Sequence, residues 1–74
     1  MITLNDLPIG YTARVLSLVS LGKERRRMLD LGFVSGSNVT VLFSSPFGDP
    51  RAYLIRGTII AIRDEDAKKI NVEF

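Results

Sequence analysis

The sequence predicts a mainly β protein: a small five-stranded antiparallel barrel with one inserted α-helix. Short runs in which apolar and polar residues alternate recur along the chain, and glycine, proline or aspartate interrupts them at short, fairly even intervals. One run, at about residues 22–31, instead has helical spacing. No linker or low-complexity stretch divides the 74 residues, so we expect a single domain spanning 1–74.

A helical turn and a strand are expected first. Thr3 can cap a turn in which Leu4 and Leu7 lie three residues apart, and both leucines are expected to close one end of the core. Residues 11–19 (YTARVLSLV) are rich in β-forming residues and alternate in polarity, which predicts the first strand.

The helix follows this strand. Leu21, Met28 and Leu29 have the i, i+7, i+8 spacing of an apolar helical stripe. Gly32 stands where a left-handed cap is expected to end the helix.

Four further strands are expected at residues 38–44, 51–57, 58–63 and 70–74, with a sharp bend at Gly57 between the third and fourth strands. Asp64 is expected to cap a single helical turn before the last strand. The side chains expected to point inward from the second and fifth strands are Val39, Val41, Phe43, Ile70, Val72 and Phe74. These elements predict a barrel of SH3-like type.

Composition excludes most small-enzyme mechanisms. The chain has no cysteine and no histidine, so it lacks thiolate and imidazole ligands, a thiol nucleophile and the commonest general base. The run DEDAKK lacks the ligand spacing of a calcium loop. No apolar run is long enough to span a bilayer, and the N-terminus does not resemble a secretory signal, so we expect a cytoplasmic protein that is not an enzyme.

The loop SSPFGDPR joins the second and third strands. Pro46 and Gly48 suit the second and fourth positions of a type I turn, and Pro50 favours an extended backbone at Asp49. The loop is therefore a stiff corner, and Phe47 at its tip is either a lid over the barrel end or an exposed anchor. The sequence leaves both interpretations open.

The helix carries an excess of cations: Lys23, Arg25, Arg26 and Arg27 against Glu24 and Asp30. Most of these charges are interpreted as a solvated face with weak pairing. Arg25 shares the apolar stripe, so we expect its guanidinium to brace a loop carbonyl or a carboxylate such as Asp49.

The segment RRRMLDLGFVSGSNVTVLFSSPFGDPRAY resembles the signature of the FeoA family, small SH3-like proteins associated with bacterial ferrous iron uptake, and the resemblance extends over residues 4–72. Three positions depart from the family pattern: Ser35 replaces a proline, Ser45 an alanine and Phe47 a leucine. The matching positions of the signature are Arg25, Met28, Leu29, Leu31, Gly32, Gly36, Pro46, Gly48, Asp49 and Pro50. Turn or cap roles are assigned to Gly32, Gly36, Pro46, Gly48, Pro50 and Gly57.

The resemblance implies an accessory protein that is held near the membrane by its partner, the cytosolic GTPase domain of a FeoB-type ferrous iron permease, on which it acts. The expected contact residues are Phe47, Asp49, Arg25, Arg26 and Arg27. The resemblance also implies an association with transition metals, which we interpret as pathway membership: with only carboxylates, carbonyls, Met1 and Met28 as ligands, the chain is expected to bind ferrous iron weakly at most.

The alternative is a small basic barrel that binds nucleic acid, free-standing or as the regulatory domain of an iron-dependent repressor. Tyr11 and Tyr53 would then supply a stacking platform. The net charge of +2 is too small to argue for this partner, and the acidic residues 64–66 count against it.

Overall fold

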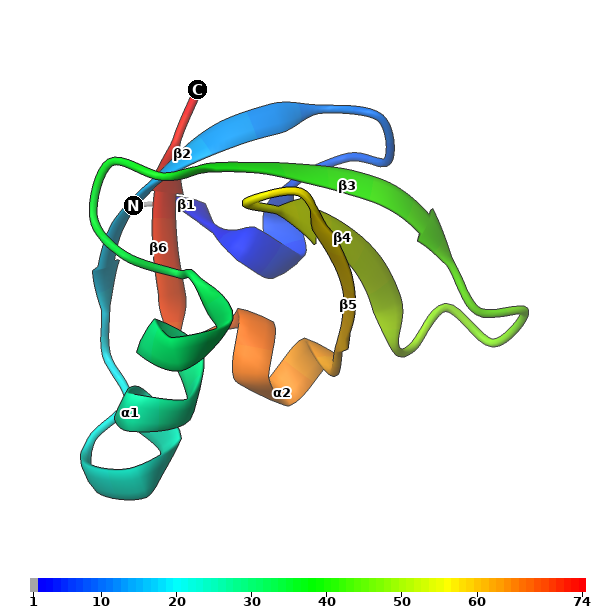
Figure 1. Cartoon of the computed structure of the whole chain (residues 1–74). Coiled ribbons are helices and arrows are strands. Elements are labelled where there is room, and N and C mark those ends of the chain that lie inside the picture. Colours follow the sequence, from blue (N-terminus) through cyan, green and yellow to red (C-terminus); the bar gives the residue numbers. More distant parts are fainter. Residues whose placement is uncertain (1) are drawn as a thin grey trace.

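The computed structural model describes residues 2–74, which form one curved antiparallel sheet that wraps around the core (Figure 1). The sheet has six strands in the order β1-β6-β2-β3-β4-β5, so β1 and β5 are its two edges. The strands are β1 (Ile2–Thr3), β2 (Thr12–Leu18), β3 (Asn38–Ser44), β4 (Arg51–Ile55), β5 (Thr58–Ile62) and β6 (Ile70–Glu73). The predicted mainly β class and its five strands are confirmed, and β1 is an additional short strand that pairs with β6.

Three helical segments interrupt the sheet: the 3-10 turn η1 (Leu4–Asp6), α1 (Gly22–Leu31) and α2 (Asp64–Ala67). The first of these is the turn expected near Thr3, and α1 has the predicted bounds. Gly32 ends α1 in the left-handed region, with φ at 112°, and its amide donates to the Leu29 carbonyl at 3.0 Å. Among residues 2–74 no helix is long and apolar enough to cross a membrane.

The core fills the concave side of the sheet. Leu4 and Leu7 are fully buried, which agrees with the expectation that they close one end of it. The other buried apolar side chains come from all parts of the chain; they include Ala13, Val15, Met28, Phe33, Val39, Val41, Tyr53, Ile55, Ile62, Ala67, Ile70 and Val72. Because β4 and β5 are joined by a tight turn in which Arg56 and Gly57 both have positive φ, the bend expected at Gly57 is present.

Four apolar side chains of the predicted inward patterns are exposed instead: Phe43, Phe74, Leu21 and Leu29. A β-bulge between Val41 and Phe43 shifts the register against β4, so the alternation that buries Val41 does not continue to Phe43. Phe74 lies beyond the end of β6. Leu21 precedes the first residue of α1 and is 81% exposed, so of the predicted stripe only Met28 is buried.

Candidate functional site

The β3–β4 loop is a hydrogen-bonded turn with a phenylalanine at its tip. The Gly48 amide donates to the Ser45 carbonyl at 2.9 Å, and the Ser45 amide donates to the Pro50 carbonyl at 3.0 Å. One hydrogen bond thus closes the tip of the loop and the other closes its base. Phe47 is 95% exposed. The loop projects away from the rest of the molecule at the right of Figure 1, which decides between the two interpretations of Phe47: it is not a lid.

Asp49 has a structural contact that the sequence did not indicate. Its Oδ1 accepts a hydrogen bond of 2.9 Å from the Asp64 amide, the first residue of α2. The expectation that Asp64 caps this helix is wrong, because Arg63 occupies the N-cap position and makes no side-chain cap bond. Asp49 satisfies a helix N-terminal amide from another part of the chain instead, and this bond ties the base of the loop to α2.

The three arginines of α1 have different surroundings. Arg25 donates from Nη1 to the Leu18 carbonyl at 3.3 Å, so of the two expected bracing partners it has the carbonyl and not Asp49. Arg27 Nη2 lies 3.6 Å from Asp66 Oδ2. Within residues 2–74, the side chain of Arg26 has no hydrogen bond or ion pair.

The structure does not bring these arginines together with Phe47. In Figure 1, α1 lies at the lower left and the β3–β4 loop at the far right. The predicted contact residues therefore form two separate surfaces, and their role in partner binding stays a prediction.

A cleft of about 370 Å³ separates α1 from β5 and α2. Two ion pairs connect the elements on either side of it: Arg27 with Asp66, and Lys69 Nζ with Glu24 Oε2 at 3.0 Å. The hydrogen bond and charge of Glu24 raise the pKa of Lys69 above its ordinary value. These two ion pairs thus connect α1 to the rest of the protein across the cleft.

The described part of the chain, residues 2–74, contains no group of three or more acidic, histidine or cysteine residues placed to hold a metal ion. Met28, one of the two methionines considered as ligands, is buried in the core, and Met1 lies outside the described residues. The expected weak affinity for ferrous iron stays a prediction.

Sequence reasoning missed Arg51, which joins β4 to the N-terminal segment around η1. Its Nη1 donates to the Leu7 carbonyl at 2.8 Å, its Nη2 to the Leu4 carbonyl at 3.0 Å and its Nε to the Tyr53 hydroxyl at 3.1 Å. The guanidinium thereby binds η1 to β4. Its position after Pro50, at the start of a strand, carries no signal for this role, since the acceptors lie 44 and 47 residues away.

Tyr53 is 1% exposed, and this burial raises the pKa of its hydroxyl above the ordinary value near 10. A buried ring cannot stack on a nucleobase, so the predicted platform of Tyr11 and Tyr53 does not exist. Tyr11 is exposed, but its ring makes an edge-to-face contact with Phe74 at a centroid distance of 5.9 Å.

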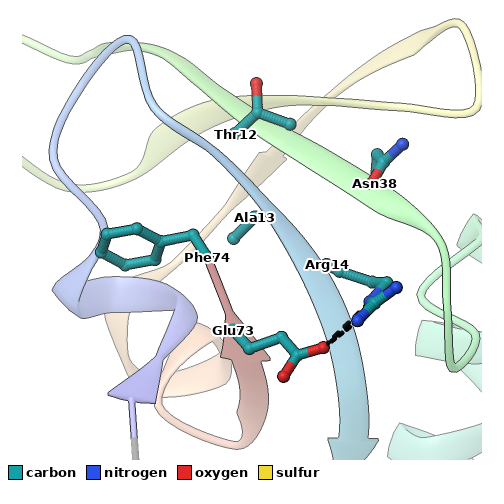
Figure 2. A pocket seen from close by; sticks show the side chains of 6 residues that line it. All are labelled: Thr12, Ala13, Arg14, Asn38, Glu73 and Phe74. Carbon is teal, nitrogen blue, oxygen red and sulfur yellow. Dashed lines mark hydrogen bonds and ion pairs between the residues drawn. The ribbon is translucent and has the colours of Figure 1, made fainter.

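Figure 2 shows a second, shallow hollow of about 440 Å³ across β2, β3 and β6 that sequence reasoning also missed. Arg14 and Glu73 form an ion pair on one side of it, and Phe74 lies on the other (Figure 2). The paired charges neutralise each other, so the two ionised side chains of the hollow are engaged with one another.

Comparison with known proteins decides the family. The model of the FeoA domain matches residues 2–74. The chain belongs to the FeoA domain family. A curated relative, the Fe(2+) transport protein A/Fe(2+) transporter FeoB fusion protein of Porphyromonas gingivalis, is 39% identical over 95% of the chain, which spans only 8% of that relative's length. Membership and this fusion connect the FeoA domain with ferrous iron transport.

Solved FeoA structures have the same fold. The solution structure of FeoA from Chlorobium tepidum has a TM-score of 0.92 at 34% identity, covering 99% of this chain and 70% of that one. FeoA from Stenotrophomonas maltophilia, solved with zinc and described as a prokaryotic SH3-domain protein, has a TM-score of 0.88 at 32% identity, covering 99% and 91%. This likeness confirms the SH3-like type. IdeR from T. acidophilum, at 22% identity and a TM-score of 0.82, covering 97% of this chain and 33% of that one, shares the fold.

Proposed function

We propose that this protein is a non-catalytic accessory module of ferrous iron uptake that binds the cytosolic domain of a FeoB-type permease in the cytoplasm. The observation that carries the proposal is the Porphyromonas gingivalis fusion, in which a domain 39% identical to this one belongs to the same chain as a FeoB transporter. Joining two modules in one chain raises their effective concentration, which is useful when the separate modules bind each other.

Phe47 is the contact that the geometry favours. An aromatic ring that is 95% exposed on a closed turn can enter a partner pocket with little loss of conformational entropy. Aromatic anchors are common among the residues that dominate protein interfaces. The bond from Asp64 to Asp49 holds the base of the loop in place and so supports the presentation of the ring.

The arginines of α1 are a second, weaker candidate contact. Arg25 and Arg27 are each held by a neighbour, so their loss would alter the structure of α1 as well as any interface. The Arg26 side chain makes no hydrogen bond or ion pair within residues 2–74. Substituting Arg26 would therefore weaken contacts with a partner without removing a side-chain bond inside the protein.

The test is a titration of the fluorescently labelled protein with the cytosolic domain of the permease, in the GDP state and with a non-hydrolysable GTP analogue. Phe47→Ser is expected to weaken binding at least about 30-fold, because an interface anchor contributes 2 kcal/mol or more. Ile59→Ser is the matched control, since Ile59 is also exposed but lies on β5. It should bind like the unaltered protein.

A parallel titration with single-stranded and duplex DNA at two salt concentrations covers the alternative partner. Tight, salt-sensitive DNA binding together with no binding to the permease domain in either nucleotide state would contradict the proposal. Equal effects of Phe47→Ser and Ile59→Ser would contradict the role of Phe47.

A further inference from the structure

The outer end of α1 and the loop before it expose aliphatic side chains. Leu21 is 81% exposed and Val19 is 60% exposed, and Leu29, further along the helix, is also exposed. Figure 1 shows that this loop and α1 project from the barrel at the lower left. Folding leaves these side chains in water, as it does aliphatic side chains elsewhere on the surface such as Ile9 and Ile59, so what sets this region apart is the charge around it.

Cations surround these aliphatic groups. Arg25, Arg26 and Leu29 line one shallow hollow together with Gly22 and Asp30, so charged and apolar groups are contiguous there. Within the described residues, neither Lys23 nor Arg26 has an ion pair.

The remaining charges of α1 do not cancel this excess. Glu24 pairs with Lys69, and Arg27 pairs with Asp66, both on the side of the helix that faces α2. On the outward side, Asp30 is therefore the one helix carboxylate left against three cations, a local excess of two positive charges.

We propose that this surface, the α1 tip (Val19, Leu21, Lys23, Arg25, Arg26 and Leu29), docks peripherally on an anionic lipid surface. A protruding helix with aliphatic side chains flanked by Lys and Arg is the pattern of segments that lie in the membrane interface, where the apolar groups enter the acyl boundary and the cations meet anionic headgroups. The charge of the tip is complementary to that surface. This inference does not rest on the proposed function, because no permease is needed for it.

The chemistry of the tip differs from that of the β3–β4 loop. Phe47 has an acidic neighbour, Asp49, and the cation that follows, Arg51, is turned to the carbonyls of η1. No Lys or Arg of the loop is thus available beside the ring. An anionic membrane would favour the α1 tip over Phe47, and the two surfaces have different partners.

The experiment is co-sedimentation of the full chain with phosphatidylcholine vesicles, with and without about 30% phosphatidylglycerol. Binding is expected only with the anionic lipid, and it should weaken as salt rises. The double substitution Lys23→Gln and Arg26→Gln should weaken it about 25-fold, since each cation near such a surface contributes about five-fold. Leu21→Ser should weaken it about 10-fold through lost apolar burial.

Two matched controls lie away from the tip. Lys68→Gln removes an exposed cation at the C-cap of α2, and Phe47→Ser removes an exposed apolar side chain of the β3–β4 loop. Both should bind vesicles like the unaltered protein, and circular dichroism should show that every variant is folded. The proposal is overturned if the unaltered chain does not bind anionic vesicles at low salt, or if the controls lose as much binding as the tip variants. It is also overturned if the tip variants keep vesicle binding but lose binding to the permease domain, because the tip would then belong to a protein interface.

Discussion

Replacing Arg51 with methionine should remove a large share of the stability of this fold. The guanidinium donates three hydrogen bonds, to the Leu4 carbonyl in η1, to the Leu7 carbonyl just after η1 and to the Tyr53 hydroxyl, and all three are partly buried. Methionine keeps much of the apolar stem but donates none of them. The substitution therefore keeps the packing of the stem and removes the hydrogen bonds together with the contact of the guanidinium carbon with the Tyr53 ring, 5.4 Å from its centroid.

The expected loss is about 3–4 kcal/mol. A hydrogen bond from a charged donor contributes about 1.5–3 kcal/mol, but the partly exposed site and the access of water to the carbonyls reduce each contribution to roughly 1 kcal/mol or slightly more. A domain of this size has a free energy of unfolding of about 4–11 kcal/mol, so Arg51→Met should leave it close to marginal.

The assay is urea denaturation followed by circular dichroism. At a slope of about 1.3 kcal/mol/M, the midpoint should fall by roughly 2–3 M. Arg14→Met is the matched control, because Arg14 forms an exposed ion pair with Glu73 and its loss should cost below about 1 kcal/mol. If Arg51→Met cost no more than this control, the argument that Arg51 joins η1 to β4 would be refuted. The stability lost in Arg51→Lys should lie between the losses in Arg14→Met and Arg51→Met, since an ammonium cannot reach all three acceptors in one geometry.

Three further predictions follow from the structure. Asp49→Ala should lower stability by about 1 kcal/mol in thermal or chemical denaturation, because the Asp64 amide loses its acceptor. Gly32→Ala should cost more, about 1–3 kcal/mol, since Gly32 has positive φ and a Cβ there would lie 2.7 Å from Arg56 Cδ. Above about pH 10, stability should fall with rising pH: unfolded Tyr53 loses its proton first, whereas burial raises the pKa of the folded hydroxyl, so the folded state binds more protons until the pH passes the folded pKa.

Each of these three predictions has a control variant of the same protein. Asp49→Asn keeps a side-chain acceptor and should recover most of the loss. Gly36→Ala meets positive φ without a close neighbour, so it should cost less than Gly32→Ala. Tyr53→Phe should flatten the fall above pH 10 to that expected from the other tyrosine and the lysines; an unchanged pH profile would show that Tyr53 is not its cause.

Most elements of the fold could be predicted because their signals are local. The bounds of α1 follow from a change of period and from the glycine that ends it, and β2 follows from its β-forming residues and its alternation, which buries Ala13 and Val15 before a bulge ends it. Prediction failed where pairing with a distant strand interrupted the alternation seen in the local sequence. Phe43 continues the alternation of β3 in sequence, but the bulge against β4 turns it outward.

The site was predicted less completely. The turn around Phe47 was recognised from its prolines and glycine, whereas the direction of the ring depends on where the barrel ends relative to the loop. Arg25 was expected to bind a loop carbonyl or Asp49 and instead binds the carbonyl of Leu18, the last residue of β2, and Arg51 was not noticed at all. Nothing near Arg51 in sequence distinguishes it from a solvated arginine.

The sequence by itself determined the class of the fold, the single long helix and the closed turn that carries Phe47, because period, composition and turn chemistry act between residues a few positions apart. Only the tertiary structure decided which groups meet: Asp49 with the Asp64 amide, and Arg51 with the Leu4 and Leu7 carbonyls. It also placed the arginines of α1 on a different side of the molecule from Phe47. These contacts join residues 15 to 47 positions apart. Their partners are set by the curvature and register of the sheet, which no short stretch of sequence encodes.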